Sequence, residues 1–209
     1  MMKRKYAEVY INKLMSTNNP RPKALLIFLL AAALSIALAG CGAGGNDEIV
    51  LIDDMAQVDF DIDYPVGQIT RDVTVTQSFV SNSDVITQLW LFGATYMRDN
   101  TATIEVALDL TDDSGVPVTS IARWTIDSAG MEDNSIIKLD VDPAGPDNHD
   151  LCGKSCLITI TSPNGEPELS PTFWMTEEDV YPDGSLSING YAQYNDLWFQ
   201  VTGRRVSSD

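Results

Sequence analysis

Carboxylates are the residues whose type and spacing point most directly to chemistry in this chain, and residues 140–150 hold a group of them. Asp142, Asp147 and Asp150 are separated there by Pro and Gly, which allow a loop to curl around one cation. Calcium binds six to eight oxygens from carboxylates, carbonyls and water. We therefore name these aspartates as candidate calcium ligands, with a solvated acidic turn as the alternative. Leu151 stands where an EF-hand loop needs Glu, so the loop is not an EF-hand.

A second acidic stretch, Asp59, Asp61 and Asp63, alternates with apolar residues over 58–63. Tyr64 stands where an EF-hand loop needs Gly, so this motif is rejected here too. The alternation predicts a strand with an acidic face instead. Carboxylates two residues apart on a strand are about 7 Å apart, too far to share one ion without help from a neighbouring element.

Exposed aromatic rings could bind carbohydrate, because the C–H face of a pyranose packs on a flat ring and needs no charge. Trp124 is in phase with apolar neighbours and is assigned to the core, whereas Trp90 lies between two leucines and fits either side of its strand. Plain packing is the alternative for every aromatic residue. The candidates fall on the polar side of a strand or in loops: Trp174, Trp198, Tyr191 and Tyr194.

Catalytic groups are scarce. His149 is the one histidine of the chain, and no Gly-x-Ser-x-Gly motif accompanies it, so the sequence does not support a Ser-His-Asp triad. A zinc site needs more His or Cys than the chain holds. Paired carboxylates for glycoside cleavage stay open, because their separation depends on the fold. We expect a protein that is not an enzyme.

The N-terminus has the order of a secretory signal. Six lysines and arginines precede an apolar run from Ala24 to Ala39. As a helix the run would reach roughly 24 Å, short of the roughly 30 Å hydrocarbon core of a bilayer, so a signal peptide over residues 1–40 is favoured over a transmembrane helix. Met15 offers a later start that would leave a more compact signal.

The run ends in Leu38, Ala39, Gly40 and Cys41, which resembles the bacterial lipobox. The resemblance implies that Cys41 receives a diacylglyceryl thioether and that its new amine is acylated after cleavage. Two or more acyl chains anchor a protein stably in a membrane. Gly42 stands where Asp is the inner-membrane retention signal of enteric bacteria, which favours the outer membrane. An unlipidated signal-anchor helix is the alternative.

Removal of residues 1–40 would change the charge of the chain from −17 to near −22. A field of that sign repels phosphate and excludes nucleic acid as a simple electrostatic partner. Two explanations stay open, a divalent metal site and a saline habitat in which proteins are acidic throughout. Residues 41–47 predict a flexible Gly-rich tether, and residues 48–209 predict one folded domain.

With Cys41 used for lipid, Cys152 and Cys156 remain. Two thiols outside the cytoplasm usually pair, so we expect a disulfide that closes a tight loop. Loop closure predicts a stabilisation of roughly 2 kcal/mol for so small a ring. The spacing is not Cys-x-x-Cys, and no helix follows, which argues against a redox role.

Strand periodicity dominates after residue 48. Apolar and polar residues alternate over 73–79, 103–111, 137–141 and 197–201, and a further strand is predicted over 156–161. Turn motifs separate these runs, such as Asp112–Gly115 and Tyr181–Gly184. No helical period persists for more than about two turns. The sequence therefore predicts an all-β fold, an antiparallel β-sandwich.

Several short motifs carry a family resemblance over roughly residues 68–202. The order of these motifs resembles a jelly-roll domain of bacterial envelope proteins, a group similar to carbohydrate-binding modules. The resemblance implies a jelly-roll-like sandwich, sugar binding and a structural calcium. The motifs include Gln77-Ser-Phe79, Leu108-Asp-Leu110, Asp133-Asn134, Tyr181-Pro-Asp-Gly184, Asn189-Gly190 and Asp196-Leu-Trp-Phe199.

Three functional hypotheses follow. The first is a lipid-anchored envelope module that binds glycan, with calcium as a candidate ion. The second is an interaction or assembly protein of the envelope that uses a sheet face or edge. The third, and the least supported, is a carboxylate-based glycoside hydrolase.

Overall fold

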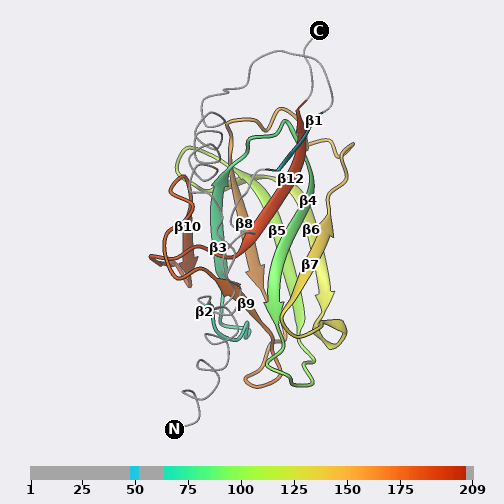
Figure 1. The fold of residues 1–209 in the computed structure, drawn as a ribbon, viewed down its shortest axis with the longest axis vertical. Helices are drawn as coiled ribbons and strands as arrows, with labels where there is room; N and C mark the ends of the chain where they lie inside the picture. Colours follow the sequence, from blue (N-terminus) through green and yellow to red (C-terminus); the bar gives the residue numbers. More distant parts are fainter. Residues whose placement is uncertain (1–47, 52–63, 206–209) are drawn as a thin grey trace, which may run out of the picture. The chain divides into compact units, whose positions relative to one another are not determined.

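The computed structural model describes residues 48–51 and 64–205, all of which belong to the unit 43–209 of the chain. These residues form two antiparallel β-sheets that pack as a sandwich (Figure 1). One 3₁₀ turn, η2 (Ser128–Gly130), is the single helical element within the described ranges. No helix in those ranges has the length and apolar character needed to cross a membrane. The predicted all-β sandwich is confirmed.

The first sheet is built around β4, the strand at its centre. β12 and β9 pair with one side of β4, and β7 pairs with the other. β1 extends the sheet beyond β12, and β2 extends it beyond β9. The strands are β1 (Glu48–Leu51), β2 (Tyr64–Pro65), β4 (Val85–Ala94), β7 (Ser135–Asp140), β9 (Thr172–Met175) and β12 (Phe199–Arg205).

The second sheet has the order β11-β10-β3-β8-β5-β6, so that β11 and β6 form its two edges. The predicted strand over 103–111 is confirmed at both ends by β5. The strands are β3 (Val75–Val80), β5 (Thr103–Thr111), β6 (Pro117–Asp127), β8 (Ser155–Thr161), β10 (Ser185–Ile188) and β11 (Tyr191–Ala192).

Connections between the sheets follow a simple rule. From β2 onward, consecutive strands lie in opposite sheets, except in the β5–β6 and β10–β11 hairpins. Repeated crossing of this kind is typical of jelly-roll and Greek-key sandwiches. It places segments far apart in the sequence next to each other, such as β3 beside β10 and β1 beside β12.

The core lies between the sheets, where each strand directs every second side chain inward. β3 and β8 alternate strictly between buried and half-buried residues, as the sequence predicts. Phe79 of β3 and Phe199 of β12 are fully buried, and their ring centroids are 5.6 Å apart across the two sheets. Burial of one such side chain stabilises the fold by roughly 1.5–3 kcal/mol.

A buried polar pair holds the loop of residues 176–184 against the sandwich. Gln77 and Asp196 are both buried, and the side-chain amide of Gln77 donates to Asp196 Oδ1 over 3.0 Å. Asp196 Oδ2 accepts the backbone N–H groups of Val180 and Tyr181, each over 2.9 Å. Burial raises the pKa of the Asp196 carboxyl, although these hydrogen bonds favour its charged form. The Tyr181 hydroxyl in turn donates to the Val80 carbonyl.

The predicted disulfide between Cys152 and Cys156 is wrong, because Cys156 is a free thiol in the structure. Cys156 lies on the inward side of β8, in phase with Ile158 and Ile160, and is fully buried in the core. Burial raises the pKa of its thiol to about 12, so it stays protonated at neutral pH. The strand period, rather than the count of cysteines, therefore decided the direction of this side chain.

Candidate functional site

Two tyrosines at the edge of the second sheet offer large exposed aromatic faces. Tyr191 begins the edge strand β11, and Tyr194 follows two residues after that strand ends. Their side chains are 76% and 75% exposed. Of the four aromatic residues singled out from the sequence, these two are the ones that the structure leaves open to solvent.

The hairpin that carries Tyr191 is fixed to the rest of the sheet. Ile188 pairs with Tyr191 across the turn Asn189-Gly190, and both turn residues have positive φ, 52° and 79°. This is the backbone of a type I′ turn, which matches the twist of the strands. Asn189 exchanges two hydrogen bonds with the backbone of Thr74, its N–H and its Oδ1 each at 2.8 Å. The tyrosines therefore project from a held element.

Trp198 does not provide an exposed face, although it lies out of phase with Leu197 and Phe199 as predicted. Its side chain is 1% exposed and packs against Phe92 of β4, with ring centroids 5.5 Å apart. Its indole Nε1 is buried and has no hydrogen-bond partner among the described residues. The prediction that Trp198 offers a platform for a ligand is therefore wrong, because the outer face of the first sheet is covered at this point.

Trp174 is half-buried on the same face. It also stacks on Phe92, with ring centroids 6.0 Å apart and an angle of 25° between the rings, and its Nε1 donates to the side chain of Asn134. Trp198 also donates its backbone N–H to the Trp174 carbonyl over 2.8 Å. Trp174 and Trp198 are thus brought together with Phe92 as a packed cluster.

The remaining tryptophans have structural contacts. Trp124 packs partly buried against the core, as predicted, and its Nε1 donates to the carbonyl of Asp140. Trp90, which the sequence left undecided, is half-buried and donates from its Nε1 to Gln88. The ammonium of Lys138 lies 4.2 Å from the centroid of its ring, a cation–π contact that covers the ring.

The side-chain amide of Asn148 holds the candidate calcium loop against β4. Asn148 is 1% exposed, and its side chain exchanges hydrogen bonds with both backbone groups of Ile86, the N–H at 2.9 Å and the carbonyl at 2.7 Å. Asp142, Asp147 and Asp150 all point to solvent. Within residues 48–51 and 64–205, no three acidic, His or Cys side chains lie close enough together to hold a metal ion. The structure therefore does not assemble the predicted ligand set.

Two other carboxyl groups with shifted pKa values also fasten turns. For Asp133, burial opposes ionisation, but hydrogen bonds from Thr95 and from the backbone of Met97 and Tyr96 outweigh it and lower the pKa. Hydrogen bonds from Ser114 and Val116 lower the pKa of Asp112 in the β5–β6 turn. In the sequence, Asp112 stood out as the start of a turn motif and Asp133 as part of the Asp133-Asn134 motif, but neither pattern indicated these hydrogen bonds.

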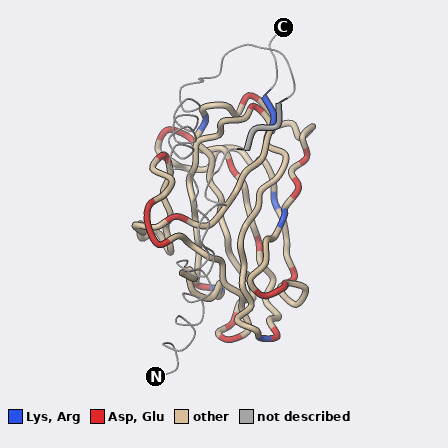
Figure 2. The backbone as a smooth tube through the Cα atoms, in the orientation of Figure 1, with Lys and Arg blue, Asp and Glu red and all other residues tan. Residues whose placement is uncertain are grey.

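Charged residues are unevenly placed in the described part of the chain. Figure 2 shows that the acidic residues gather mostly in loops and turns, whereas lysines and arginines are few. His149 is exposed in the acidic loop of residues 140–150. The strand faces are left mainly with hydroxyl and apolar side chains.

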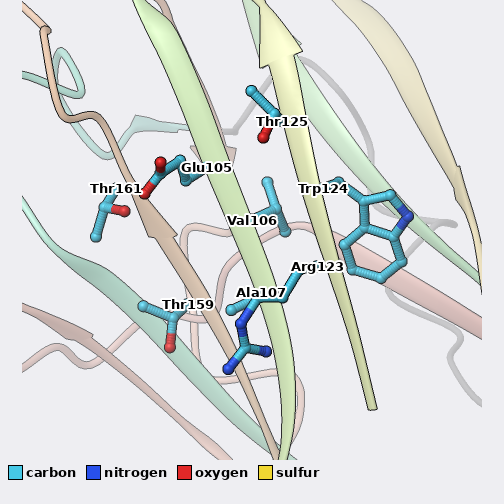
Figure 3. A pocket seen from close by; sticks show the side chains of 8 residues that line it. All are labelled: Glu105, Val106, Ala107, Arg123, Trp124, Thr125, Thr159 and Thr161. Carbon is cyan, nitrogen blue, oxygen red and sulfur yellow. The ribbon is translucent and has the colours of Figure 1, made fainter. Parts of the chain in front are cut away.

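A small hollow, which was not predicted from the sequence, opens on the outer face of the second sheet (Figure 3). Its volume is about 270 Å³, and Ala107 of β5 is among the residues that line it. Glu105 of β5, Arg123 of β6 and Thr159 of β8 form part of its rim. A hollow of this size lies just below the range of ligand pockets for small molecules, about 300–1,000 Å³.

Several predictions lie outside the described residues. Cys41 as the lipid attachment site, the signal peptide over 1–40 and the tether over 41–47 belong to residues 1–47. The acidic strand with Asp59, Asp61 and Asp63 lies in residues 52–63.

No protein-family model matches the chain, and no curated protein matches it. One similar solved structure contains the cysteine protease and lectin-like domains of Cwp84, a surface layer associated protein of Clostridium difficile, with a TM-score of 0.38 and 13% identity. That alignment covers 64% of this chain and 32% of the other. A xylanase 10C mutant from Cellvibrio japonicus in complex with xylopentaose aligns with a TM-score of 0.25 and 12% identity, over 70% of this chain and 26% of the other. The chain thus spans about a third or less of the length of these proteins.

Proposed function

We propose that this protein is a lipid-anchored protein of the bacterial envelope whose β-sandwich binds carbohydrate without cleaving it. The observation that carries the proposal is the pair Tyr191 and Tyr194, each about three-quarters exposed on or beside a hairpin that Asn189 fastens to the sheet. Aromatic rings on a held element lose little conformational entropy when a ligand packs on them.

Stacking is the interaction that such tyrosines suit. The C–H face of a sugar ring is apolar and packs on an aromatic ring, while the phenol hydroxyl stays free to bond with sugar hydroxyls. No charge is needed, so the acidity of the chain does not oppose binding to a neutral glycan. This binding mode requires no catalytic group, and we propose a protein that is not an enzyme.

A glycan array of the purified full chain tests the proposal, run once with calcium and once with a chelator. We expect binding that falls at least about fivefold in Tyr191→Ala and in Tyr194→Ala, because loss of one stacked ring removes about 1 kcal/mol or more of contact. Tyr64→Ala is the matched control, since Tyr64 is also exposed, at 49%, but lies in β2 of the other sheet. A response that is equal with calcium and with chelator shows that no ion takes part.

Lack of binding by a folded sample in both conditions would contradict the proposal. It would favour the second candidate function, an interaction or assembly protein of the envelope. The edge strand β6 supports that alternative, together with Val116 just before this strand and Val118 at its start, whose side chains are 55% and 58% exposed. Edge strands present unpaired backbone groups to which a partner strand can add.

Anchoring is proposed through acyl chains on Cys41, in the outer membrane. We expect Cys41→Ser to yield a chain that incorporates no acyl label and moves to the aqueous phase in detergent partitioning. The unchanged chain should carry the label and stay in the detergent phase, because two or more acyl chains hold a protein at a membrane. Cys156→Ala is the matched cysteine control, and an unlabelled wild-type chain would disprove the anchor.

A further inference from the structure

The hollow on the second sheet has a simple geometric origin. Ala107 pairs with Thr159 on one side and with Arg123 on the other, so all three side chains lie on the outer face. Glu105 and Asp109 stand two residues before and after it on the same face. A methyl group is thus surrounded by longer side chains, and the space above it is the hollow of about 270 Å³.

The charge of the hollow is negative. Arg123 Nη2 lies 2.6 Å from the Asp109 carboxylate, which is only 6% exposed, so these two charges offset each other. Arg123 Nη1 also donates to the Ala122 carbonyl over 3.0 Å, which fixes the guanidinium at the rim. Glu105 is exposed and has no cation beside it among the described residues. One uncompensated negative charge therefore remains at the rim.

The other polar groups at the rim are free to bind a ligand. Figure 3 shows Glu105 and Thr161 turned toward each other across the gap between β5 and β8, with Thr125 on the β6 side. Among the described residues, the hydroxyls of Thr125, Thr159 and Thr161 make no hydrogen bond with protein groups. Trp124 also lines the hollow, and its indole, whose Nε1 donates to the Asp140 carbonyl, projects from the far side of β6.

We propose that this hollow binds one amine-bearing sugar ring, with the ammonium group beside Glu105 and the ring hydroxyls bonded to the three threonines and Arg123. The apolar floor at Ala107 suits the C–H face of the ring. The uncompensated Glu105 favours a cation over a neutral ring and opposes an anion. This is a second site, because Ala107 lies four strands from β11, about 19 Å away at the usual strand spacing.

The test is a nuclear magnetic resonance titration of the ¹⁵N-labelled full chain with glucosamine, glucose and glucuronate. We expect shifts of amides in β5, β6 and β8 around Ala107, with a Kd for glucosamine about threefold to fivefold below that for glucose, the effect of one exposed ion pair. Glucuronate should bind most weakly. The preference for glucosamine should disappear in Glu105→Gln and in about 0.5 M NaCl.

Three variants test whether the amide shifts and the preference for glucosamine arise from the hollow and its charge. Ala107→Leu fills the hollow and should abolish binding of all three sugars, with an unchanged melting temperature as the check on folding. Asp113→Asn removes one charge from an exposed turn outside the hollow and should keep the preference. The double variant Tyr191→Ala, Tyr194→Ala should leave the amide shifts around Ala107 unchanged. A failure of sugar binding in the hollow is therefore distinguishable from a failure of glycan binding at the two tyrosines. Unchanged binding in Ala107→Leu, or a preference for glucuronate, would overturn the proposal.

Discussion

At the residue scale, Asp133 shows how one carboxylate can hold a turn. Its Oδ1 accepts hydrogen bonds from the backbone N–H of Thr95 over 2.7 Å and from the Thr95 hydroxyl over 3.0 Å. The next two residues, Tyr96 and Met97, both have positive φ, 58° and 55°, a region that L-residues adopt at a cost. The turn is therefore stabilised by the ionised form of one side chain.

This arrangement predicts the sign of a pH effect. Because the folded pKa of Asp133 lies below its ordinary value, its contribution to stability is present above the ordinary pKa of about 4 and is lost as the pH falls through the lowered pKa. We expect Asp133→Asn to lower the free energy of unfolding by about 1 kcal/mol at pH 7 and by less at pH 2.5.

Urea unfolding of both proteins at the two pH values measures the difference. Asp147→Asn is the control, since Asp147 is an exposed aspartate in a different loop. A deficit of Asp133→Asn that is equal at the two pH values would show that the carboxylate charge has no part in holding the turn.

At the element scale, the loop of residues 176–184 shows why the motifs behind the family resemblance are structural. Gln77 comes from one motif, Asp196 from another and Tyr181 from a third, and the three meet in one hydrogen-bonded network. Gly184 ends the loop so close to β3 that a Cβ there would lie 2.1 Å from the Ser78 carbonyl oxygen. The motifs therefore specify how the sandwich closes, which many different functions can share.

Removal of Asp196 should loosen this loop. Asp196→Ala leaves the Gln77 amide and the N–H groups of Val180 and Tyr181 without their acceptor, and unsatisfied buried donors cost about 1–3 kcal/mol each. We expect a loss of about 3 kcal/mol in chemical unfolding, with faster hydrogen exchange at Val180 and Tyr181. Asp183→Ala, an exposed acid of the same loop, is the matched control. Equal stability of the two variants would contradict the role given to Asp196.

At the scale of the whole molecule, the acidic surplus sets the response to salt. The chain has 30 acidic and 13 basic side chains, and most acidic residues of the described part lie in loops on the surface. Added salt screens the repulsion between these carboxylates, since the Debye length falls from about 30 Å at 0.01 M to about 8 Å at 0.15 M salt. The folded state, which is more compact, gains most from this screening.

We therefore expect NaCl to raise the melting temperature between 0.01 and 0.15 M, by about 2 to 4 °C for each kcal/mol of relieved repulsion. CaCl₂ at equal ionic strength should raise it by a similar amount if screening is the cause. A larger rise with CaCl₂ would instead indicate a specific site for the ion. A melting temperature that falls with NaCl would contradict the argument from charge repulsion.

The sequence by itself determined the class of fold. The alternation over 73–79 and 103–111 is a direct consequence of the pleat, in which successive side chains point to opposite faces, so it could be recognised without knowing which strands pair. Applied to β8, the same period of two places the Cys156 side chain on the inward face of the strand. The predicted disulfide with Cys152 rested on the count of cysteines and did not use this period.

Only the tertiary structure decided what each surface offers. Trp198 and Tyr191 both looked available in the sequence, but Phe92 of β4 packs against Trp198, whereas Tyr191 lies on an edge strand that leaves it open. The hollow at Ala107 depends on the register of β5 with β6 and β8, which brings together residues from 105 to 161. Local periodicity is fixed by the backbone of one strand, whereas exposure and clustering depend on which strands lie side by side.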